Sequence, residues 1–341
     1  MQCMRQRIRM CAAMAAVLAL LVGMSGCGKE FEVDENGQDA SGKDDSLIVV
    51  GVSQVGSESV WRTANTASIQ RVFSKENGYL LIFDNARQKQ ENQIKAIQSY
   101  ISQQVDYIVF SPIVEDGWDT VLKEAKDAGI PVILMDRKVK VSDESLYTTC
   151  VGSNFEKEGK DAGRWLAKYL EQEGRRDETV NIVVLQGTTG ATSTYGRTEG
   201  FNQIVKTQKN WEILEQTDAD FTTAKGKEEM RRMLKEYKDI DVLVSQNDDM
   251  TFGAIEAIEE VGKKPGEDII IVSFDGVMSA LEMVKAGKIN VDLECNPEQG
   301  VHVEKVIRML ENGESVEKSY YVPEKVFTRK NVDNFMDDRT Y

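Results

Sequence analysis

The stretch "LIVVGVSQVGSESVWR", residues 47–62, decides the fold. It opens with an apolar run rich in valine and isoleucine, which is typical of a strand buried on both faces in a parallel sheet. The run leads directly into a loop that carries serines, a carboxylate, an indole and a guanidinium group. In open parallel sheets, ligands bind beyond the carboxyl ends of the strands. The stretch therefore predicts a parallel sheet with a polar site where its first strand ends.

Strand-like and helix-like stretches alternate along the rest of the chain. In the first half, strands are predicted at "LIVVGVS", "YLLIFDN", "DYIVFSP" and "PVILMD", and after "LYTTCVGSN" the alternation restarts with "VNIVVLQG", "DVLVSQND" and "DIIIVSFD". This pattern predicts an α/β protein with two doubly wound parallel-sheet lobes. A late strand, helix and strand at "INVDLEC", "GVHVEKVIRMLENG" and "SYYVPEKVF" offer a return to the first lobe.

Residues 1–26 have the pattern of a lipoprotein signal peptide. Three arginines precede a short apolar run, and Ser25 and Gly26 stand immediately before Cys27. A membrane-spanning helix needs roughly 20 apolar residues, which is more than this run offers. We therefore predict export and a lipid attached to Cys27, so that the protein contacts the membrane through its lipid anchor only. Residues 27–46 are acidic and almost free of apolar side chains, which is typical of a flexible tether.

Composition excludes several classes of function. The 341 residues carry a formal net charge of -15 at pH 7, so no nucleic-acid partner is expected. The single histidine, His302, lies in a predicted helix, so a histidine-dependent triad has no base and no metal or other cofactor is predicted, although calcium at a surface loop stays open. The stretch "GATSTYGRT" is not a phosphate loop, because its glycines are wrongly spaced and Arg197 stands where lysine is needed.

Polar clusters follow five of the predicted strands. They read "SQVGSESVWR", "MDR", "LQGTTG", "SQNDD" and "SFDG". Helix capping explains any one of them equally well, and it is the interpretation that we favour for Asp248 and Asp249. Five such strand ends drawn from both halves indicate one shared site. Hydroxyls, carboxylates, guanidinium groups and an aromatic face are what a polyhydroxylated ring needs.

These motifs, in this order, resemble the type I periplasmic sugar-binding proteins of ABC transporters, and most of all their galactofuranose-binding members. The resemblance is carried by the strand ends above together with "QKQENQIKAIQS", "GWDTVLKEAKDAGIPVILMDR", "RTEGF", "DADFTTAKGKE" and "SQNDDMTFGAIEAI". It implies two lobes joined by a hinge that the chain crosses three times. Residues 47–151 and about 296–326 would form one lobe, and residues 152–295 and about 327–341 the other.

The resemblance also implies which side chains hold the sugar. Asp136, Arg137 and Arg197 would bind ring hydroxyls, Asn247 and Asp275 would form the opposite wall, Phe221 and Trp61 would sandwich the ring, and Ser57, Glu58 and Arg62 would set specificity. Two alternatives stay open from the residues alone: Trp61 as a core aromatic and Arg62 as a solvated helix charge.

The chain departs from the family pattern in two places. Cys295 stands before "NPEQ" where some relatives place glutamine, and Tyr195 and Gly196 precede Arg197 unexpectedly, which predicts a reshaped loop. Besides Cys27, the mature chain keeps Cys150 and Cys295. We expect both as free buried thiols, because a disulfide requires Cα atoms within ~7 Å and aimed side chains. A disulfide near the hinge is the alternative.

The favoured function is that of a monomeric, non-enzymatic receptor at the extracytoplasmic face of the cell membrane. It would capture a monosaccharide, galactofuranose or a similar sugar, and deliver it to an ABC transporter permease. One alternative is a sugar receptor that presents its ligand to a membrane sensor kinase. Another is an exported glycosidase using two carboxylates, with Glu58, Asp136 and Asp275 as candidates.

Overall fold

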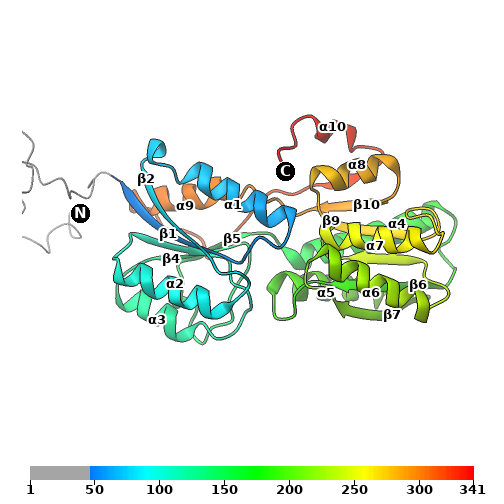
Figure 1. The fold of residues 1–341 in the computed structure, drawn as a ribbon, viewed down its shortest axis with the longest axis horizontal. Coiled ribbons are helices and arrows are strands. Elements are labelled where there is room, and N and C mark those ends of the chain that lie inside the picture. The colour runs from blue at the N-terminus through cyan, green and yellow to red at the C-terminus, as the bar shows by residue number, and fades with distance from the viewer. Residues whose placement is uncertain (1–46) are drawn as a thin grey trace, which may run out of the picture. The chain divides into compact units, whose positions relative to one another are not determined.

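The computed structural model describes residues 47–341. The predicted signal peptide, the lipid attachment site Cys27 and the tether lie outside the described residues. Within residues 47–341, no helix combines the length and the apolar character that crossing a membrane requires. The described chain forms two lobes, each built on a six-stranded sheet with helices on both faces (Figure 1). The predicted fold of two doubly wound lobes is confirmed.

The sheet of the first lobe is entirely parallel. Across the sheet its strands lie in the order β2 (Tyr79–Asn85), β1 (Ile48–Gln54), β3 (Tyr107–Phe110), β4 (Val132–Met135), β5 (Thr149–Gly152) and β11 (Ser319–Tyr321). One face is covered by α2 (Gln90–Ser102) and α3 (Asp119–Asp127), and the other by α1 (Val60–Val72) and α9 (Gly300–Glu311). Two short 3-10 helices, η1 (Lys75–Asn77) and η2 (Glu144–Leu146), lie in its connections.

The second lobe repeats this plan. Its strand order is β7 (Trp211–Asp218), β6 (Val180–Gln186), β8 (Val242–Ser245), β9 (Ile270–Asp275), β10 (Val291–Glu294) and β12 (Val326–Thr328), and only β12 is antiparallel to its neighbour. Helices α4 (Phe155–Gln172) and α5 (Thr192–Val205) cover one face. Helices α6 (Thr223–Glu236), α7 (Asp248–Glu260) and α8 (Met278–Ala286) cover the other, and the short α10 (Asp333–Met336) follows β12.

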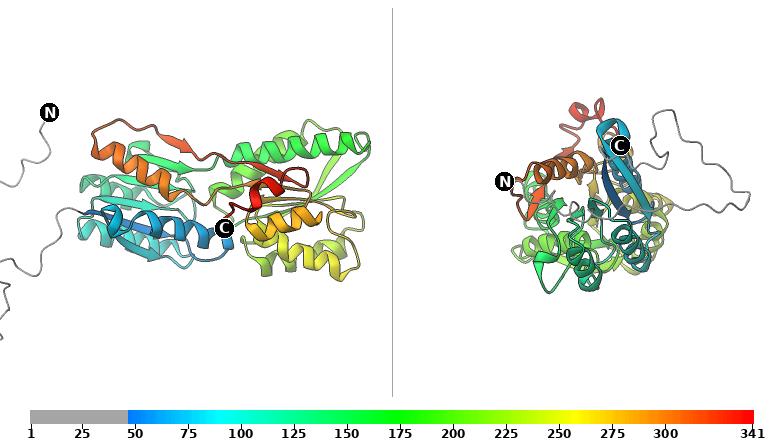
Figure 2. Two further views of the ribbon diagram at one scale, coloured as in Figure 1. Left: turned by 90° about the horizontal axis from the view of Figure 1, so that it is seen from above. Right: turned by 90° about the vertical axis from the view of Figure 1, so that its left-hand side faces the viewer.

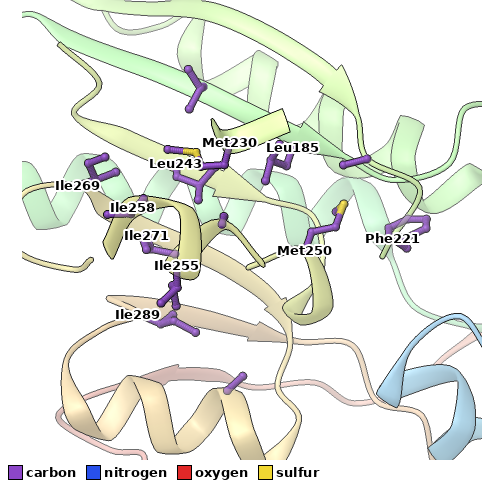
Figure 3. Packing of buried hydrophobic residues seen from close by; sticks show 14 of the residues in the cluster. Leu185, Phe221, Met230, Leu243, Met250, Ile255, Ile258, Ile269, Ile271 and Ile289 are labelled. Atoms are coloured by element: carbon purple, nitrogen blue, oxygen red, sulfur yellow. The ribbon is translucent and has the colours of Figure 1, made fainter. Parts of the chain in front are cut away.

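Each sheet is buried on both faces because helices cover both, and successive side chains of a strand point to opposite faces. In β3, Ile108 and Phe110 pack with α2 and α3, whereas Tyr107 and Val109 pack with α1 and α9. Figure 3 shows the corresponding core of the second lobe, where Phe221 lies at the edge of the apolar cluster. At this edge, the ring of Phe221 is available for contacts outside the core.

The chain passes between the lobes three times. The passages lie between β5 and α4, between β10 and α9, and between β11 and β12, so that the late helix α9 belongs to the first lobe and α10 to the second (Figure 2). The sequence placed the third passage near residues 326–327, but Val326 already pairs with Leu293 in β12. Cys150 and Cys295 are free and buried, as predicted.

Candidate functional site

A cavity lies between the carboxyl ends of the two sheets. Its lining comes from both lobes and consists of Glu58, Ser59, Trp61, Arg62, Asp136, Arg137, Phe155, Ser193, Arg197, Phe221, Asn247, Asp275 and Cys295. Every residue predicted for the sugar site lines this cavity except Ser57. The hydroxyl of Ser57 instead accepts a hydrogen bond from Asn85 at 3.2 Å, and the residue is exposed.

Arg62 organises the wall that the first lobe contributes. Its guanidinium group donates to Asp136 at 2.8 Å and to Glu58 at 3.1 Å, and its side chain is only 3% exposed. Burial lowers the pKa of Arg62, but these two carboxylates outweigh it and raise the pKa above its ordinary value. Arg62 is therefore a buried, charged part of the cavity wall, and the solvated-charge alternative is wrong.

Arg137 is less well compensated. Its Nη1 donates to the carbonyl of Ile113 at 3.2 Å, its Nε lies 3.7 Å from Asp136, and that Nε has no hydrogen-bond partner among the described residues. Burial, followed by repulsion from Arg62, lowers the pKa of Arg137 to about 10. The group still carries its charge at neutral pH, so a donor of a buried cation remains unpaired at the cavity.

Arg197 organises the opposite wall. It comes from α5, and its Nε donates to Glu158 of α4 at 2.7 Å while its Nη2 lies 3.6 Å from Asp275. It also donates to the carbonyl of Gln246. The guanidinium group is thus held from three sides, and the sequence did not identify Glu158 as its partner.

Two aromatic side chains face the cavity. Trp61 is buried, and its indole N–H donates to the carbonyl of Cys295 at 2.5 Å, which joins the start of α1 to the second interlobe passage. The ring also packs with the core of the second lobe, so Trp61 is a core aromatic and a cavity-lining residue at once. Phe221 lies after β7, and the Arg137 guanidinium carbon is 5.4 Å from its ring centroid. That the two rings sandwich a ligand remains a prediction.

The helix cap at "SQNDD" differs from the expectation. Asn247 is the residue that caps α7, accepting from the Met250 amide at 2.9 Å. Asp248 bonds to the Ser273 hydroxyl at 2.6 Å, and Asp249 accepts from the amide of Val60 in the first lobe at 3.1 Å. The two aspartates were therefore wrongly interpreted as caps, because their side chains reach other elements instead.

Three lining residues have a left-handed backbone. Asp136 has φ 65°, Phe221 has φ 59° and Asp275 has φ 115°. Such conformations cost about 1–3 kcal/mol each for residues other than glycine, and they persist where the surrounding structure imposes them. Each of the three follows the end of a strand or closes it, so the unusual backbone turns a side chain toward the cavity.

The chemistry of the lining suits a neutral, hydroxyl-rich ligand. Three carboxyl groups, from Glu58, Asp136 and Asp275, face the same number of guanidinium groups, so the lining offers both acceptors and donors. Three buried polar atoms of the lining have no hydrogen-bond partner among the described residues: Glu58 Oε2, Arg137 Nε and Ser193 Oγ. An acceptor, a donor and a hydroxyl are what vicinal hydroxyl groups satisfy.

Sequence reasoning did not assign Ser59, Phe155, Ser193 or Cys295 to the ligand. Ser193 lies in "GATSTYGRT", which lacks the spacing of a phosphate loop but follows a predicted strand end. Ser59 caps α1 by accepting from the Arg62 amide at 3.0 Å. Phe155 begins α4 directly after the first interlobe passage, and Cys295 lies in the second. Proximity to the predicted passages is the signal that could have found both.

Comparison with known proteins agrees with this geometry. Residues 50–300 match the model of a periplasmic binding protein domain. The galactofuranose-binding protein YtfQ of Escherichia coli (strain K12) is 44% identical over 253 residues, which cover 73% of this chain and 78% of that protein.

Two solved structures are similar over nearly their whole length. One, from Mycobacterium smegmatis in complex with β-D-fucofuranose, has a TM-score of 0.82 and 42% identity and covers 86% of this chain and 96% of that one. The other is the periplasmic binding component of an arabinose ABC transporter from Shewanella sp. ANA-3, bound to α- and β-L-arabinofuranose. It has a TM-score of 0.80 and 41% identity, with 86% and 95% of the chains covered.

Proposed function

The chain belongs to the periplasmic binding protein family, and from this premise we propose that it captures a neutral monosaccharide in its furanose form, galactofuranose or a close analogue, and delivers it to an ABC permease. The relatives support this choice, because those named above bind galactofuranose, fucofuranose and arabinofuranose. The family is one of binding proteins, and the protein is accordingly not an enzyme, which excludes the glycosidase alternative.

The observation that carries the proposal is the set of unpaired polar atoms in one cavity. Glu58 Oε2 and Arg137 Nε belong to the first lobe and Ser193 Oγ to the second. A buried donor or acceptor without a partner costs about 1–3 kcal/mol, and more when it is charged. A small polyol that reaches all three removes this cost only when both lobes surround it.

The site residues predicted from the sequence receive roles within this proposal. Arg62, Asp136 and Glu58 form a rigid hydrogen-bonded group that presents oxygen and nitrogen atoms to one edge of the sugar. Arg197, Asn247 and Asp275 face it from the other lobe. The apolar C–H face of the ring rests on Phe221 or Trp61, as sugar rings do on aromatic surfaces.

The cellular context completes the proposal. We propose that the protein is a monomer held at the extracytoplasmic face of the membrane by a lipid on Cys27, after removal of residues 1–26. Delivery to a permease is supported by relatives named as parts of sugar importers, among them the Shewanella protein above.

Ring size gives the sharpest test of the ligand. We expect 1,4-anhydrogalactitol, which has a five-membered ring, to bind at least about tenfold more tightly than 1,5-anhydrogalactitol, which has a six-membered ring, because a misplaced hydroxyl leaves a buried charged group unpaired. Calorimetric titration of the mature protein measures both affinities. Free D-galactose, D-fucose and L-arabinose serve as positive controls, since each forms furanose rings in water.

The outcomes separate the parts of the proposal. Stronger binding of the six-membered compound would contradict the furanose preference but not sugar binding. Absence of heat with every sugar and polyol would contradict the function itself.

A second expected result concerns closure of the lobes. The described cavity is closed: Arg62, Asp136, Arg197 and Asp275 are each no more than 4% exposed, so a ligand enters only if the lobes separate. Contacts made from both lobes then favour the closed state. The radius of gyration in small-angle scattering should therefore decrease when saturating sugar is added. Identical curves with and without sugar would show that this hinge does not open in solution.

A further inference from the structure

One cluster of side chains, mostly buried, brings together all three interlobe passages. Ser153 lies in the first passage, Cys295 in the second and Glu324 in the third. The Ser153 hydroxyl lies 3.2 Å from the Cys295 sulfur and donates to Glu324 Oε1, and the amide of Asn296 donates to the same oxygen at 3.4 Å. The cluster therefore crosses the hinge.

Glu158 links this cluster to the candidate sugar site. Its Oε2 accepts from Arg197 Nε at 2.7 Å, and its Oε1 is buried and has no hydrogen-bond partner among the described residues. One oxygen of Glu158, one oxygen of Glu324 and the Cys295 sulfur lie within 4.8 Å of one another. The Glu158 carboxyl group thus stands between the cavity and the third passage.

The charges of this cluster do not balance if both glutamates are ionised. Among residues 47–341, Arg197 is the one cation that forms an ion pair with this cluster, and it already pairs with Glu158 and lies near Asp275. The ion pairs of the described residues include none at Glu324. Asp136 adds a further negative charge from the first lobe. Two carboxylates this close in a buried site cannot both ionise without a large penalty.

We propose that Glu324 is a positioning residue for the sugar site: it remains protonated in the closed protein, shares its proton with Glu158, and so holds the Arg197 guanidinium in place. This proposal rests on the proposed function, since Arg197 is a predicted sugar contact. It adds the prediction that sugar binding depends on pH through a residue that does not line the cavity.

The titration of the two glutamates agrees with this geometry. Burial, followed by repulsion from Glu158, raises the pKa of Glu324 to about 9. Burial also raises the pKa of Glu158, although Arg197 opposes that shift. Arg197 forms an ion pair with Glu158 and none with Glu324, so it favours the ionised form of Glu158 and the proton belongs on Glu324. The thiol of Cys295 remains neutral, since burial raises its pKa well above the ordinary value.

A metal ion is a less fitting occupant than a proton. The cluster offers two carboxylates and a thiol, which is a plausible ligand set. One of the carboxylates, however, is already neutralised by Arg197, and the guanidinium group would repel a divalent cation across the shared Glu158. A single proton resolves the excess negative charge without that repulsion.

The sign of the pH effect follows from linkage. An acid whose pKa is raised in the closed state takes up a proton on closing, so its contribution to closure is complete below its ordinary pKa of 4.5 and is lost as pH rises toward about 9. Sugar affinity should therefore fall with rising pH. Asp249 also bonds across the lobes, and burial raises its pKa to about 6, so it titrates mainly below pH 6.5.

The test compares affinities for L-arabinose between pH 6.5 and 8.5. For the wild-type protein, the dissociation constant should rise by about threefold to tenfold per pH unit, the upper limit being the uptake of one proton. Glu324→Gln keeps a neutral hydrogen-bonding side chain, so its affinity should fall less steeply with pH than that of the wild type and should exceed it at pH 8.5. Asp275 of the cavity wall, whose pKa is also raised by burial, is common to both proteins. Glu317→Gln, an exposed acid before β11, is the matched control and should retain the wild-type slope.

Unfolding of the sugar-free protein provides an independent measurement. The free energy of unfolding in urea should fall more steeply with pH in the wild type and in Glu317→Gln than in Glu324→Gln. Other buried acids such as Asp275 and Asp292 are common to all three proteins, so the difference in slope reports on Glu324 alone. If the pKa of Glu324 is already raised in the sugar-free protein, its effect lies in the urea slope; if the pKa rises only on closing, its effect lies in the affinity slope. Equal slopes in Glu324→Gln and the wild type in both measurements would overturn the proposal. If no sugar binds at all, the proposed function fails, while the urea measurement still decides whether Glu324 holds the proton.

Discussion

Replacing Arg137 with methionine should weaken sugar binding about 10- to 150-fold, the effect of losing a charged hydrogen bond worth about 1.5–3 kcal/mol. The sugar-free protein should remain as stable as before, within about 1 kcal/mol. Arg137 is 4% exposed, and burial lowers its pKa to about 10, so its charge opposes folding. Methionine fills a similar volume and leaves no buried cation.

Calorimetry with L-arabinose and urea unfolding measure the two quantities. Arg176→Met is a suitable control, since Arg176 is exposed and makes one surface ion pair with Glu171. Both proteins should unfold at the same urea concentration, and only Arg137→Met should lose affinity. Retention of full affinity would remove Arg137 from the site.

Substitution of Asp136 cannot test sugar binding separately from stability. It is the counter-ion of buried Arg62 at 2.8 Å and also accepts from Ser111 at 3.1 Å. Removing one partner of a buried ion pair leaves the other charge without compensation and costs about 3–5 kcal/mol. Loss of binding in Asp136→Ala would therefore mix a stability defect with a lost sugar contact.

Gly187→Ala should reduce sugar affinity at least about tenfold and cost about 1–3 kcal/mol of stability through overpacking. Gly187 follows β6, and a Cβ there would lie 1.8 Å from Cζ of Phe221. No strained backbone angle is involved at this glycine, so the clash with the ring is the whole effect. The ring must move away from Gly187, and the space beside it is the cavity that Phe221 lines.

A second substitution tests this explanation. Phe221→Leu shortens the side chain, so the double variant Gly187→Ala with Phe221→Leu should be more stable than Gly187→Ala alone, and the two effects should not add. Calorimetry and urea unfolding of the wild type, the two single variants and the double variant supply the double-mutant cycle. Additive effects would show that the alanine does not act through Phe221.

Much of the fold was predictable because local patterns carry it. Strands such as "PVILMD" are apolar on both faces, which is specific to a sheet covered by helices on both sides. The repeat of the same alternation after "LYTTCVGSN" indicated a second lobe. The end of the chain was harder to assign, because β11 and β12 have three residues each and lie in different sheets, and such short strands have little pattern of their own.

The candidate site was predictable in part for a related reason. Parallel strands place their carboxyl ends at one edge of a sheet, so polar residues there, such as Asp136, Asn247 and Asp275, were expected to gather. The pairing among them was not predictable. Ser57 and Ser59 stand two residues apart, yet only Ser59 lines the cavity, because the loop geometry decides which side chain points inward.

The sequence by itself determined the two-lobed α/β architecture and the strand ends that carry the polar residues, since hydrophobic periodicity and parallel-strand geometry are local properties of the chain. Only the tertiary structure decided that Glu158 holds Arg197 and that Ser153, Cys295 and Glu324 meet at the hinge. These groups come from segments up to 171 residues apart. Burial and charge balance depend on that proximity, and they set which carboxyl group keeps its proton and which guanidinium donor is left for a ligand.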